Sequence, residues 1–301
     1  MRPERVIGVD VGGTKILAGV VARDGSIAAT KEIPTPTGSE EAVLAGMDRV
    51  VADLLDEGVA AIGYGVPCNI DRRTGLALRA VNLPLDDVDF VAHGRERFGL
   101  PTGVENDANA AALAEWRLGA GRGASDLVML TLGTGVGGGL VIDNRLYRGW
   151  AELGHIVVEE GGPPCQGNCH GLGHLEAVAS GLAADRAARE LWGPEADAPA
   201  LVERARAGNP QAVAALARLG ELLGAAIGSL VNIFDPDLVV IGGGFGAAAG
   251  DLVLEPARAA ARREAIRPAD ARLRIVETEL GERAGLIGAA LVAFEALDGE
   301  R

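Results

Sequence analysis

The stretch "RVIGVDVGGTKILAGVVA" (5–22) decides the fold of this 301-residue chain. Apolar residues fill the segments on both sides of a turn that is nearly all glycine, and this pattern predicts two strands joined as a hairpin. The pattern returns at "LVMLTLGTGVGGGLVI" (127–142), again as strand, glycine turn and strand. The internal repeat predicts two related α/β domains that face each other across a cleft.

The rest of the chain alternates buried strands with amphipathic helices. A helix is expected over 39–58, where a Ser cap precedes apolar residues at helical spacing, and another around 175–190. We expect residues 1–118 to form the first domain and residues 119–283 the second, with a short hinge where they join. The last helix, from about 284 to the end of the chain, is expected to pack back on the first domain.

Composition excludes several classes of function. The formal net charge is −14 and aromatic residues make up 3% of the chain, which argues against a nucleic-acid surface. No stretch approaches eighteen uninterrupted apolar residues, and the N-terminus runs straight into a strand, so neither a membrane span nor a signal peptide is expected. We therefore expect a cytoplasmic protein, whose three cysteines are thiols or metal ligands.

Three glycine turns predict contacts with an anion. In "DVGGTK" (10–15), glycines without a Cβ let the backbone N–H groups approach a phosphate, and the adjacent Asp suits a hydrated Mg²⁺. "GTGVGGG" (133–139) contains G-x-G-x-x-G, but a strand follows it, whereas a dinucleotide fingerprint needs a helix. "VVIGGGFG" (239–246) follows a buried strand and precedes a helix. An ordinary hairpin or a helix cap also explains each turn taken alone, but three together favour a nucleotide site.

The stretch "ENDANAAALAE" (105–115) ends a strand and begins a helix. Asp107 at this junction is a candidate catalytic carboxylate, and a helix cap is the ordinary alternative.

A metal site is predicted from four ligand types that lie close together in the sequence. His155, Cys165, Cys169 and His174 supply two imidazoles and two thiolates, which complete a tetrahedral Zn²⁺ without an open position and so indicate a structural site. His170 is a rival for His174 as the fourth ligand. A disulfide between Cys165 and Cys169 is the alternative. Cys68 lies outside the group and is expected to be a buried or pocket-edge thiol.

Together, "DVGGTK", "ENDANAAALAE", "LTLGTGVGGG", "AELGH" and the Cys/His stretch ending "GHLE" occur in the order and approximate spacing of the ROK family (repressors, open reading frames and sugar kinases). The chain resembles the ATP-dependent glucokinases of that family over essentially its whole length. The resemblance implies a two-domain actin-like ATPase (ribonuclease H-like) fold with an interdomain cleft. It also implies phosphorylation of the 6-hydroxyl of glucose with ATP and Mg²⁺, and a homodimer or a dimer of dimers.

The resemblance assigns roles to individual residues. Asp107 matches the catalytic base of the family. The residues that match its sugar-binding positions are Asn82, Asn106, Asp107, Glu152, His155 and Glu176. Those that match its nucleotide-binding positions are Asp10, Gly12, Gly13, Thr14, Lys15, Gly133, Thr134, Gly135, Gly242, Gly243 and Gly244. The metal ligands depart from the family: its common pattern is C-x-C-x4-C, whereas this chain has C-x3-C-x4-H, with His174 in place of the third cysteine.

Other members of the family define the alternatives. A kinase for another hexose (mannose or fructose) or for an N-acetylhexosamine (N-acetylmannosamine or N-acetylglucosamine), or a glucokinase that uses polyphosphate, would share these motifs. A sugar-responsive repressor needs a helix-turn-helix before "DVGGTK", and only nine residues precede Asp10 here. A zinc-binding module without catalysis does not account for the three glycine turns.

Overall fold

A computed structural model of the protein describes residues 4–80, 82–167 and 169–299, which form two compact units. Unit 1 comprises Met1–Arg122, Leu146–Trp150 and Arg283–Arg301, and unit 2 comprises Gly123–Arg145 and Ala151–Glu282. Residues 1–3 and 300–301, which the domain prediction includes, lie outside the described residues. Segment Leu146–Trp150 belongs to unit 1, although the residues on both sides of it along the chain belong to unit 2.

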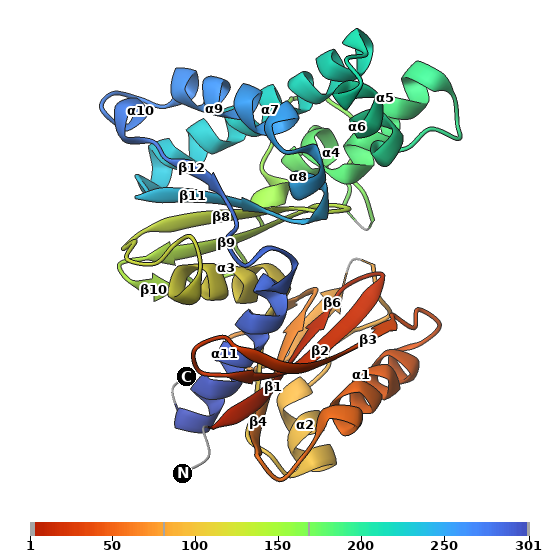
Figure 1. Cartoon of the computed structure of the whole chain (residues 1–301), viewed down its shortest axis with the longest axis vertical. Helices are drawn as coiled ribbons and strands as arrows, with labels where there is room; N and C mark the ends of the chain where they lie inside the picture. The colour runs from red at the N-terminus through yellow and green to blue at the C-terminus, as the bar shows by residue number, and fades with distance from the viewer. Residues whose placement is uncertain (1–3, 81, 168, 300–301) are drawn as a thin grey trace. The chain divides into compact units, whose positions relative to one another are not determined.

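Unit 1 is built on a five-stranded sheet in the order β3-β2-β1-β4-β7 (Figure 1). Strand β1 pairs antiparallel with β2 and parallel with β4, and β4 pairs parallel with β7. A small hairpin of β5 and β6 accompanies the sheet. The strand bounds are β1 Arg5–Val11, β2 Lys15–Ala22, β3 Ile27–Pro34, β4 Val59–Val66, β5 Cys68–Ile70, β6 Ala77–Ala80 and β7 Thr102–Asn106.

Helices cover both faces of this sheet (Figure 1). Helices α3 and α11 pack together on one face, and α1 and α2 pack on the other. Gly63 of β4 lets α11 come close, because a Cβ there would lie 1.9 Å from the backbone oxygen of Ala289. The helix bounds are α1 Glu40–Leu54, α2 Phe90–Phe98, α3 Asp107–Leu118 and α11 Ala284–Asp298.

Unit 2 repeats the strand order of unit 1. Its sheet has the order β10-β9-β8-β11-β12, with β8 antiparallel to β9 and parallel to β11, and β11 parallel to β12. Two units of the same topology, each opening on a glycine hairpin, confirm the predicted actin-like ATPase fold. The strand bounds are β8 Leu127–Leu132, β9 Val136–Ile142, β10 Arg145–Leu146, β11 Leu238–Gly242 and β12 Ile275–Glu277.

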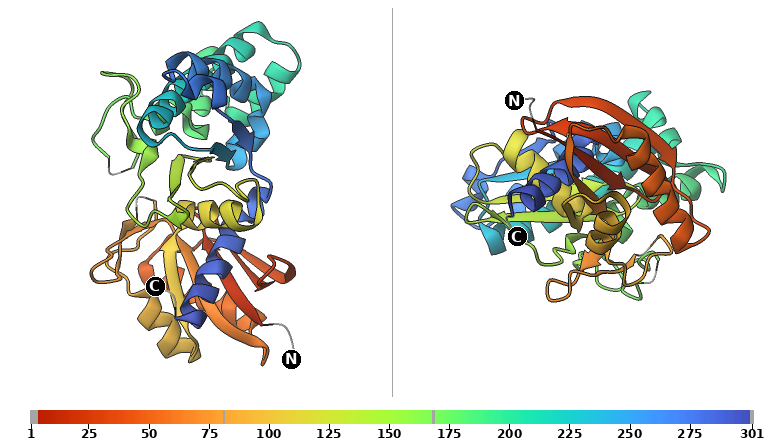
Figure 2. Two further views of the ribbon diagram at one scale, coloured as in Figure 1. Left: turned by 90° about the vertical axis from the view of Figure 1, so that its left-hand side faces the viewer. Right: turned by 90° about the horizontal axis from the view of Figure 1, so that it is seen from below.

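The helices of unit 2 gather on one side of its sheet (Figures 1 and 2). The longest of them, α7, is apolar and long enough to cross a membrane by length and composition, but half of its most apolar window is buried. It packs against α4, α5, α6 and α9, so it is a core helix of unit 2. The helix bounds are α4 Leu175–Ala179, α5 Gly181–Trp192, α6 Ala198–Arg206, α7 Pro210–Phe234, α8 Gly244–Ala249, α9 Asp251–Glu264 and α10 Ala269–Arg272, with 3-10 turns η1 Leu153–His155 and η2 Gly281–Arg283.

Capping residues explain where several helices begin. Ser39 caps α1 by accepting a hydrogen bond from the N–H of Ala42, as its position before an apolar repeat predicts. The expectation of one helix around 175–190 is wrong, because Ser180 interrupts it in an extended conformation. The Ser180 hydroxyl accepts from the N–H of Ala183 and starts α5 as a separate helix.

Candidate functional site

The carboxyl ends of β1, β4 and β7 meet at one edge of the unit 1 sheet. In the strand register, Asp10 pairs with Gly65, and Gly65 pairs with Glu105. Asn106 ends β7, and Asp107 begins α3 directly after it. The structure therefore brings the first glycine turn and the start of α3 to the same sheet edge, where α/β proteins bind ligands.

Asn106, not Asp107, caps helix α3. The Asn106 Oδ1 atom accepts hydrogen bonds from the backbone N–H groups of Ala108 (3.0 Å) and Asn109 (3.1 Å). Asp107 is the first residue of the helix, and its Oδ1 accepts from the Ala108 N–H at 2.8 Å. Asn106 occupies the cap position, and Asp107 only shares the Ala108 N–H with it, so the helix does not need Asp107 as its cap residue. This arrangement favours a chemical role for Asp107.

Cys68 lies beside this turn as a buried thiol, as predicted. Its backbone oxygen accepts a 3.4 Å hydrogen bond from the Asn106 side chain, and the residue is 2% exposed. Burial, with a smaller contribution from the charge of Asp107, raises the pKa of Cys68 to about 12. The thiol is therefore neutral at physiological pH and is a poor nucleophile.

The carboxyl group of Asp10 faces the first turn of α11, because a Cβ on Gly285 would lie 2.4 Å from its Oδ2. Burial raises the pKa of Asp10 to about 6, against a smaller opposing effect of Lys15. The folded protein therefore holds this proton more tightly than the unfolded chain, in which the pKa is about 3.9. Since the folded state binds more protons, the contribution of Asp10 to stability falls as the pH rises from about 4 to about 6 and stays low above that range.

We expect Asp10→Asn to raise the free energy of unfolding at pH 7.5 by about 1–3 kcal/mol, because the buried charge is removed. Urea denaturation without nucleotide or Mg²⁺, at pH 4.5 and 7.5, measures the effect, which should shrink at the lower pH. Asp24→Asn is the control, because Asp24 is exposed and hydrogen bonds from Ser26 lower its pKa. Equal stability of Asp10→Asn and the parent at pH 7.5 would contradict the expectation.

Each glycine turn contains one glycine that the protein itself does not require. A Cβ on Gly13, Gly133 or Gly244 would meet no other protein atom within 4 Å, and none of the three has a positive φ angle. Neither internal packing nor backbone strain therefore explains glycine at these positions. A missing Cβ does let a phosphate approach the backbone N–H groups, so the geometry favours ligand contact over an ordinary hairpin.

The second and third glycine turns share one edge of the unit 2 sheet. Gly242 of β11 pairs with Thr131 of β8, and the next residue, Gly243, has a φ of +86°. A Cβ on Gly243 would lie 2.3 Å from the backbone oxygen of Leu132. Gly243 thus serves close packing between the turns, which leaves Gly244 as the glycine of this turn with open space beside it.

The start of α5 holds the second glycine turn in place. The N–H of Gly181 donates to the oxygen of Gly133 at 2.8 Å, and the N–H of Leu182 donates to the oxygen of Thr134 at 3.3 Å. These bonds fix two consecutive carbonyl groups of the turn. Thr134 itself is exposed.

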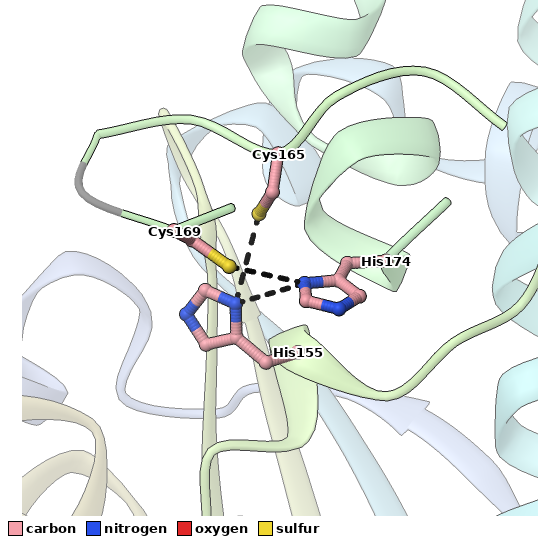
Figure 3. A group of neighbouring side chains, drawn as sticks. All are labelled: His155, Cys165, Cys169 and His174. Carbon is pink, nitrogen blue, oxygen red and sulfur yellow. Dashed lines mark hydrogen bonds between the residues drawn. The ribbon is translucent and has the colours of Figure 1, made fainter. Parts of the chain in front are cut away.

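His155, Cys165, Cys169 and His174 converge on one point of unit 2 (Figure 3). The two Nδ1 atoms of the histidines are 3.2 Å apart, Cys165 Sγ lies 3.6 Å from Nδ1 of His155, and Cys169 Sγ lies 3.5 Å from Nδ1 of His174. Tetrahedral Zn²⁺ with ordinary bond lengths separates two nitrogens by about 3.4 Å and a nitrogen from a sulfur by about 3.5 Å. These three distances match a tetrahedral zinc ion, and all four ligand atoms lie within 4.8 Å of one another.

The groups around Cys165 disfavour its thiolate on balance. Burial, together with Cys169 and Glu176, raises the pKa of Cys165 to about 12 against an opposing hydrogen bond from the backbone N–H of Gln166. A thiol in such surroundings ionises only when a cation lies beside it. Both cysteines of the cluster are free, and the structure contains no disulfide between them. The chemistry of the donor set thus agrees with a metal ligand role.

The structure distinguishes the two candidate histidines of the loop. His174 points its Nδ1 into the cluster, whereas His170 is exposed and is outside the group. His155 also uses Nδ1, and its Nε2 lies on the other side of the ring, 3.8 Å from Glu152 Oε2. A metal on Nδ1 would fix the tautomer and leave Nε2 as a hydrogen-bond donor.

Glu176 links the metal loop to the second glycine turn. Its Oε2 accepts a 3.0 Å hydrogen bond from the N–H of Val136, and its Oε1 lies 3.7 Å from Cys165 Sγ. A Cβ on Gly135 would lie 2.0 Å from Glu176 Oε2 and 2.7 Å from Gln166 Nε2. A side chain at position 135 would therefore displace the ends of the Glu176 and Gln166 side chains. Gln166, which sequence reasoning did not single out, also packs against this turn.

Two further predicted residues are Asn82 and Lys15. Asn82 is exposed and, among the described residues, takes part in no hydrogen bond with another side chain. Lys15 forms an ion pair with Glu32 of β3 at 3.2 Å. Sequence reasoning also missed Glu105, a fully buried carboxylate two residues before Asp107; its only signal was an acid inside an otherwise buried strand.

Comparison with known proteins gives consistent matches. A sequence model of the ROK family matches residues 6–296. The glucokinase of Streptomyces coelicolor is 37% identical over 96% of this chain and 97% of its own, and the glucokinase of Thermotoga maritima is 36% identical over 98% and 99%. The crystal structure of a ROK family glucokinase from Streptomyces griseus, in complex with glucose and AMPPNP, superimposes with a TM-score of 0.86 at 37% identity and covers 97% of this chain and 99% of its own.

Proposed function

The chain belongs to the ROK family, and from this premise we propose that it is an ATP-dependent glucokinase that phosphorylates the 6-hydroxyl of glucose. The observation that carries the proposal is the placement of Asp107 at the first position of α3, where Asn106 already supplies the cap. Phosphoryl transfer depends mainly on positioning and charge stabilisation, with a base close to the attacking oxygen. Asp107 is the carboxylate that fits this role.

Asp107 acts as the general base in this proposal. Its carboxylate accepts the proton of the 6-hydroxyl as the bond from that oxygen to phosphorus forms. The Oδ1 bond to the Ala108 N–H fixes the carboxylate on the rigid start of a helix. A fixed base contributes through orientation as well as through proton transfer.

The sugar-binding residues are proposed from their chemistry. Carboxylates and amides pair each hydroxyl of a polyol with a donor or an acceptor. His155 contributes its Nε2, since its Nδ1 faces the Cys/His cluster. Glu176 has one oxygen committed to Val136, so Oε1 is the atom that it offers. The proposed sugar-binding set is Asn82, Asn106, Asp107, Glu152, His155 and Glu176.

The nucleotide is proposed to bind at the three glycine turns. The open space beside Gly13, Gly133 and Gly244 supports contact between backbone N–H groups and phosphate oxygens. Mg²⁺, when bound with ATP, neutralises charge on the phosphoryl oxygens. Asp10, at the start of the first turn, is the carboxylate that would hold the hydrated ion. The other proposed contacts are Gly12, Thr14, Lys15, Thr134, Gly135, Gly242 and Gly243.

Zn²⁺ is proposed as a structural ion held by His155, Cys165, Cys169 and His174. Four protein ligands leave no open coordination position, so the ion would order the loop and take no part in the reaction. We also propose a cytoplasmic location and a homodimer or a dimer of dimers, as in the family that the sequence resembles.

A coupled ADP-release assay tests the function. Glucose, mannose, fructose, N-acetylglucosamine and N-acetylmannosamine are compared as acceptors, with ATP and polyphosphate as donors. We expect the highest kcat/KM with glucose and ATP. A clear preference for another sugar or for polyphosphate would contradict the assignment as an ATP-dependent glucokinase, but the protein would still be a sugar kinase. Inactivity with every pair of acceptor and donor would contradict both assignments.

A further inference from the structure

Glu105 is a fully buried carboxylate near the proposed base that none of the roles above uses. It is 0% exposed and lies in β7, two residues before Asp107. A buried charge is costly unless it is paired and hydrogen-bonded. The contacts of Glu105 therefore indicate what the chain uses it for.

One carboxylate oxygen of Glu105 accepts hydrogen bonds from three donors. Its Oε1 accepts from Arg72 Nη2 at 2.7 Å, from the backbone N–H of Asn106 at 3.0 Å and from Asn109 Nδ2 at 3.2 Å. Asn106 and Asn109 belong to the cap and first turn of α3, so these bonds surround Asp107 on both sides along the chain. Glu105 thus fixes the backbone from which the proposed base projects.

The other oxygen of Glu105 faces the segment Leu146–Trp150. Its Oε2 has no hydrogen-bond partner among the described residues, and Arg148 Nε lies 3.8 Å away. Arg148 forms an ion pair with Glu295 of α11, and its backbone oxygen accepts from Arg72 Nε. The segment is thus held to the same carboxylate from a second direction.

The same network also binds the backbone of that segment. Asn109 Nδ2, which donates to Glu105, also donates to the Gly149 oxygen at 3.4 Å. Gly149 is three residues before Glu152, and Ala151 between them has a positive φ of 48°. A change at Glu105 would therefore reach both the turn that carries Asp107 and the polypeptide that continues into Glu152.

We propose that Glu105 is a positioning residue: its carboxylate fixes the Asn106–Asp107 turn and ties that turn to Leu146–Trp150 through Arg72, Asn109 and Arg148. The inference rests on the proposed role of Asp107 as the base. Two positive and two negative side chains form the network, Arg72 and Arg148 with Glu105 and Glu295, so its charge balances. Glu105→Gln keeps the size and shape of the side chain but removes one of the two negative charges that face the arginines.

The kinetic test compares Glu105→Gln with Glu115→Gln. Glu115 is a matched control, since it is also fully buried and lies in α3, but its Oε2 binds the N–H of Ala120 at the far end of that helix. We expect Glu105→Gln to lower kcat at least about 10-fold with the KM for ATP unchanged, as for misplaced catalytic groups. Glu115→Gln should lose stability and keep kcat. Equal kcat losses in both variants, or a kcat of Glu105→Gln within twofold of the parent (about 0.4 kcal/mol), would overturn the proposal.

A double-mutant cycle keeps the test independent of stability. Arg148→Gln and the double variant Glu105→Gln/Arg148→Gln are measured beside the single variants. If the two residues act as one unit, the double variant should be no slower than Glu105→Gln alone. If the kcat loss of the double variant equals the product of the losses of the two single variants, Glu105 and Arg148 act independently, and the proposed link between them would be overturned.

Amide hydrogen exchange provides a readout that needs no turnover. Glu105→Gln should exchange faster in both 104–109 and 146–150, whereas Glu115→Gln should leave 146–150 unchanged. Unchanged exchange of both segments in Glu105→Gln would overturn the proposal even if the kinase assay failed. Loss of activity in Asp107→Asn together with full activity in Glu105→Gln would overturn this inference alone, while an inactive parent would overturn the proposed function.

Discussion

Replacing Asp107 with Asn is expected to lower kcat by about 10²- to 10⁴-fold, the range of a lost general base. Asn keeps the size of the side chain and can still accept the hydrogen bond from the Ala108 N–H, but it cannot take a proton from a hydroxyl. Because Asn106 caps α3, the helix keeps its start, and the lost charge at the helix N-terminus costs about 0.3–1 kcal/mol. Binding of glucose and of ATP should remain close to that of the parent.

Single-turnover kinetics with direct binding measurements separate these effects. Asp89→Asn is the matched control: Asp89 caps α2 in the same unit, and Asn is an equally good cap, so kcat should not change. Turnover of Asp107→Asn close to the parental rate would remove Asp107 from the role of base. A loss of glucose binding comparable to the loss of turnover would instead indicate that Asp107 mainly holds the sugar.

Replacing Cys165 with Ser is expected to remove the metal and to raise the Kd for glucose at least about 10-fold, equivalent to about 1.4 kcal/mol. Loss of the metal should affect the proposed sugar-binding residues, because His155 is a proposed ligand of both zinc and sugar. Glu176, another proposed sugar ligand, lies 3.7 Å from the Cys165 sulfur. Glu176 also binds the N–H of Val136, so release of the loop should disturb the second glycine turn and weaken nucleotide binding. The loss of sugar affinity should be at least as large as the loss of stability.

Metal content, denaturation and calorimetric glucose binding are measured on the same preparations. The parent should hold about one equivalent of zinc and Cys165→Ser less than half. The control is a pair of histidine variants: His174→Gln should behave like Cys165→Ser, and His170→Gln should behave like the parent, because His170 is exposed and outside the cluster. Unchanged glucose affinity in a folded, zinc-free variant would show that the loop does not support the sugar site.

Local signals in the sequence determined much of the architecture. The glycine turns at 12–14 and 133–135 lie between two strand-like apolar runs, and the repetition of this hairpin at 127–142 predicted two related α/β domains, whose sheets have the same strand order. The order and spacing of the motifs predicted the fold and the family, because strand ends, turns and helix starts follow one another along the chain. The same signals indicated Asp107, which lies at the start of α3.

Other features depended on contacts between distant segments, which no local pattern encodes. Cys165 is four residues from Cys169 and nine from His174, and spacing alone fits either His170 or His174 as the fourth ligand. The choice depends on which ring faces the cluster, and that is decided by the path of the loop between η1 and α4. Likewise, Ser180 breaks the helix expected around 175–190, because its hydroxyl caps α5.

The network of Glu105 shows most clearly which contacts cannot be predicted from the sequence. Along the chain, Arg72 is 33 residues from Glu105, and Arg148 is 147 residues from Glu295. The sequence by itself determined that an acid stands in a buried strand next to Asp107. Only the tertiary structure brought two arginines and the segment Leu146–Trp150 to that acid, because a buried carboxylate is stable only where the fold supplies its partners.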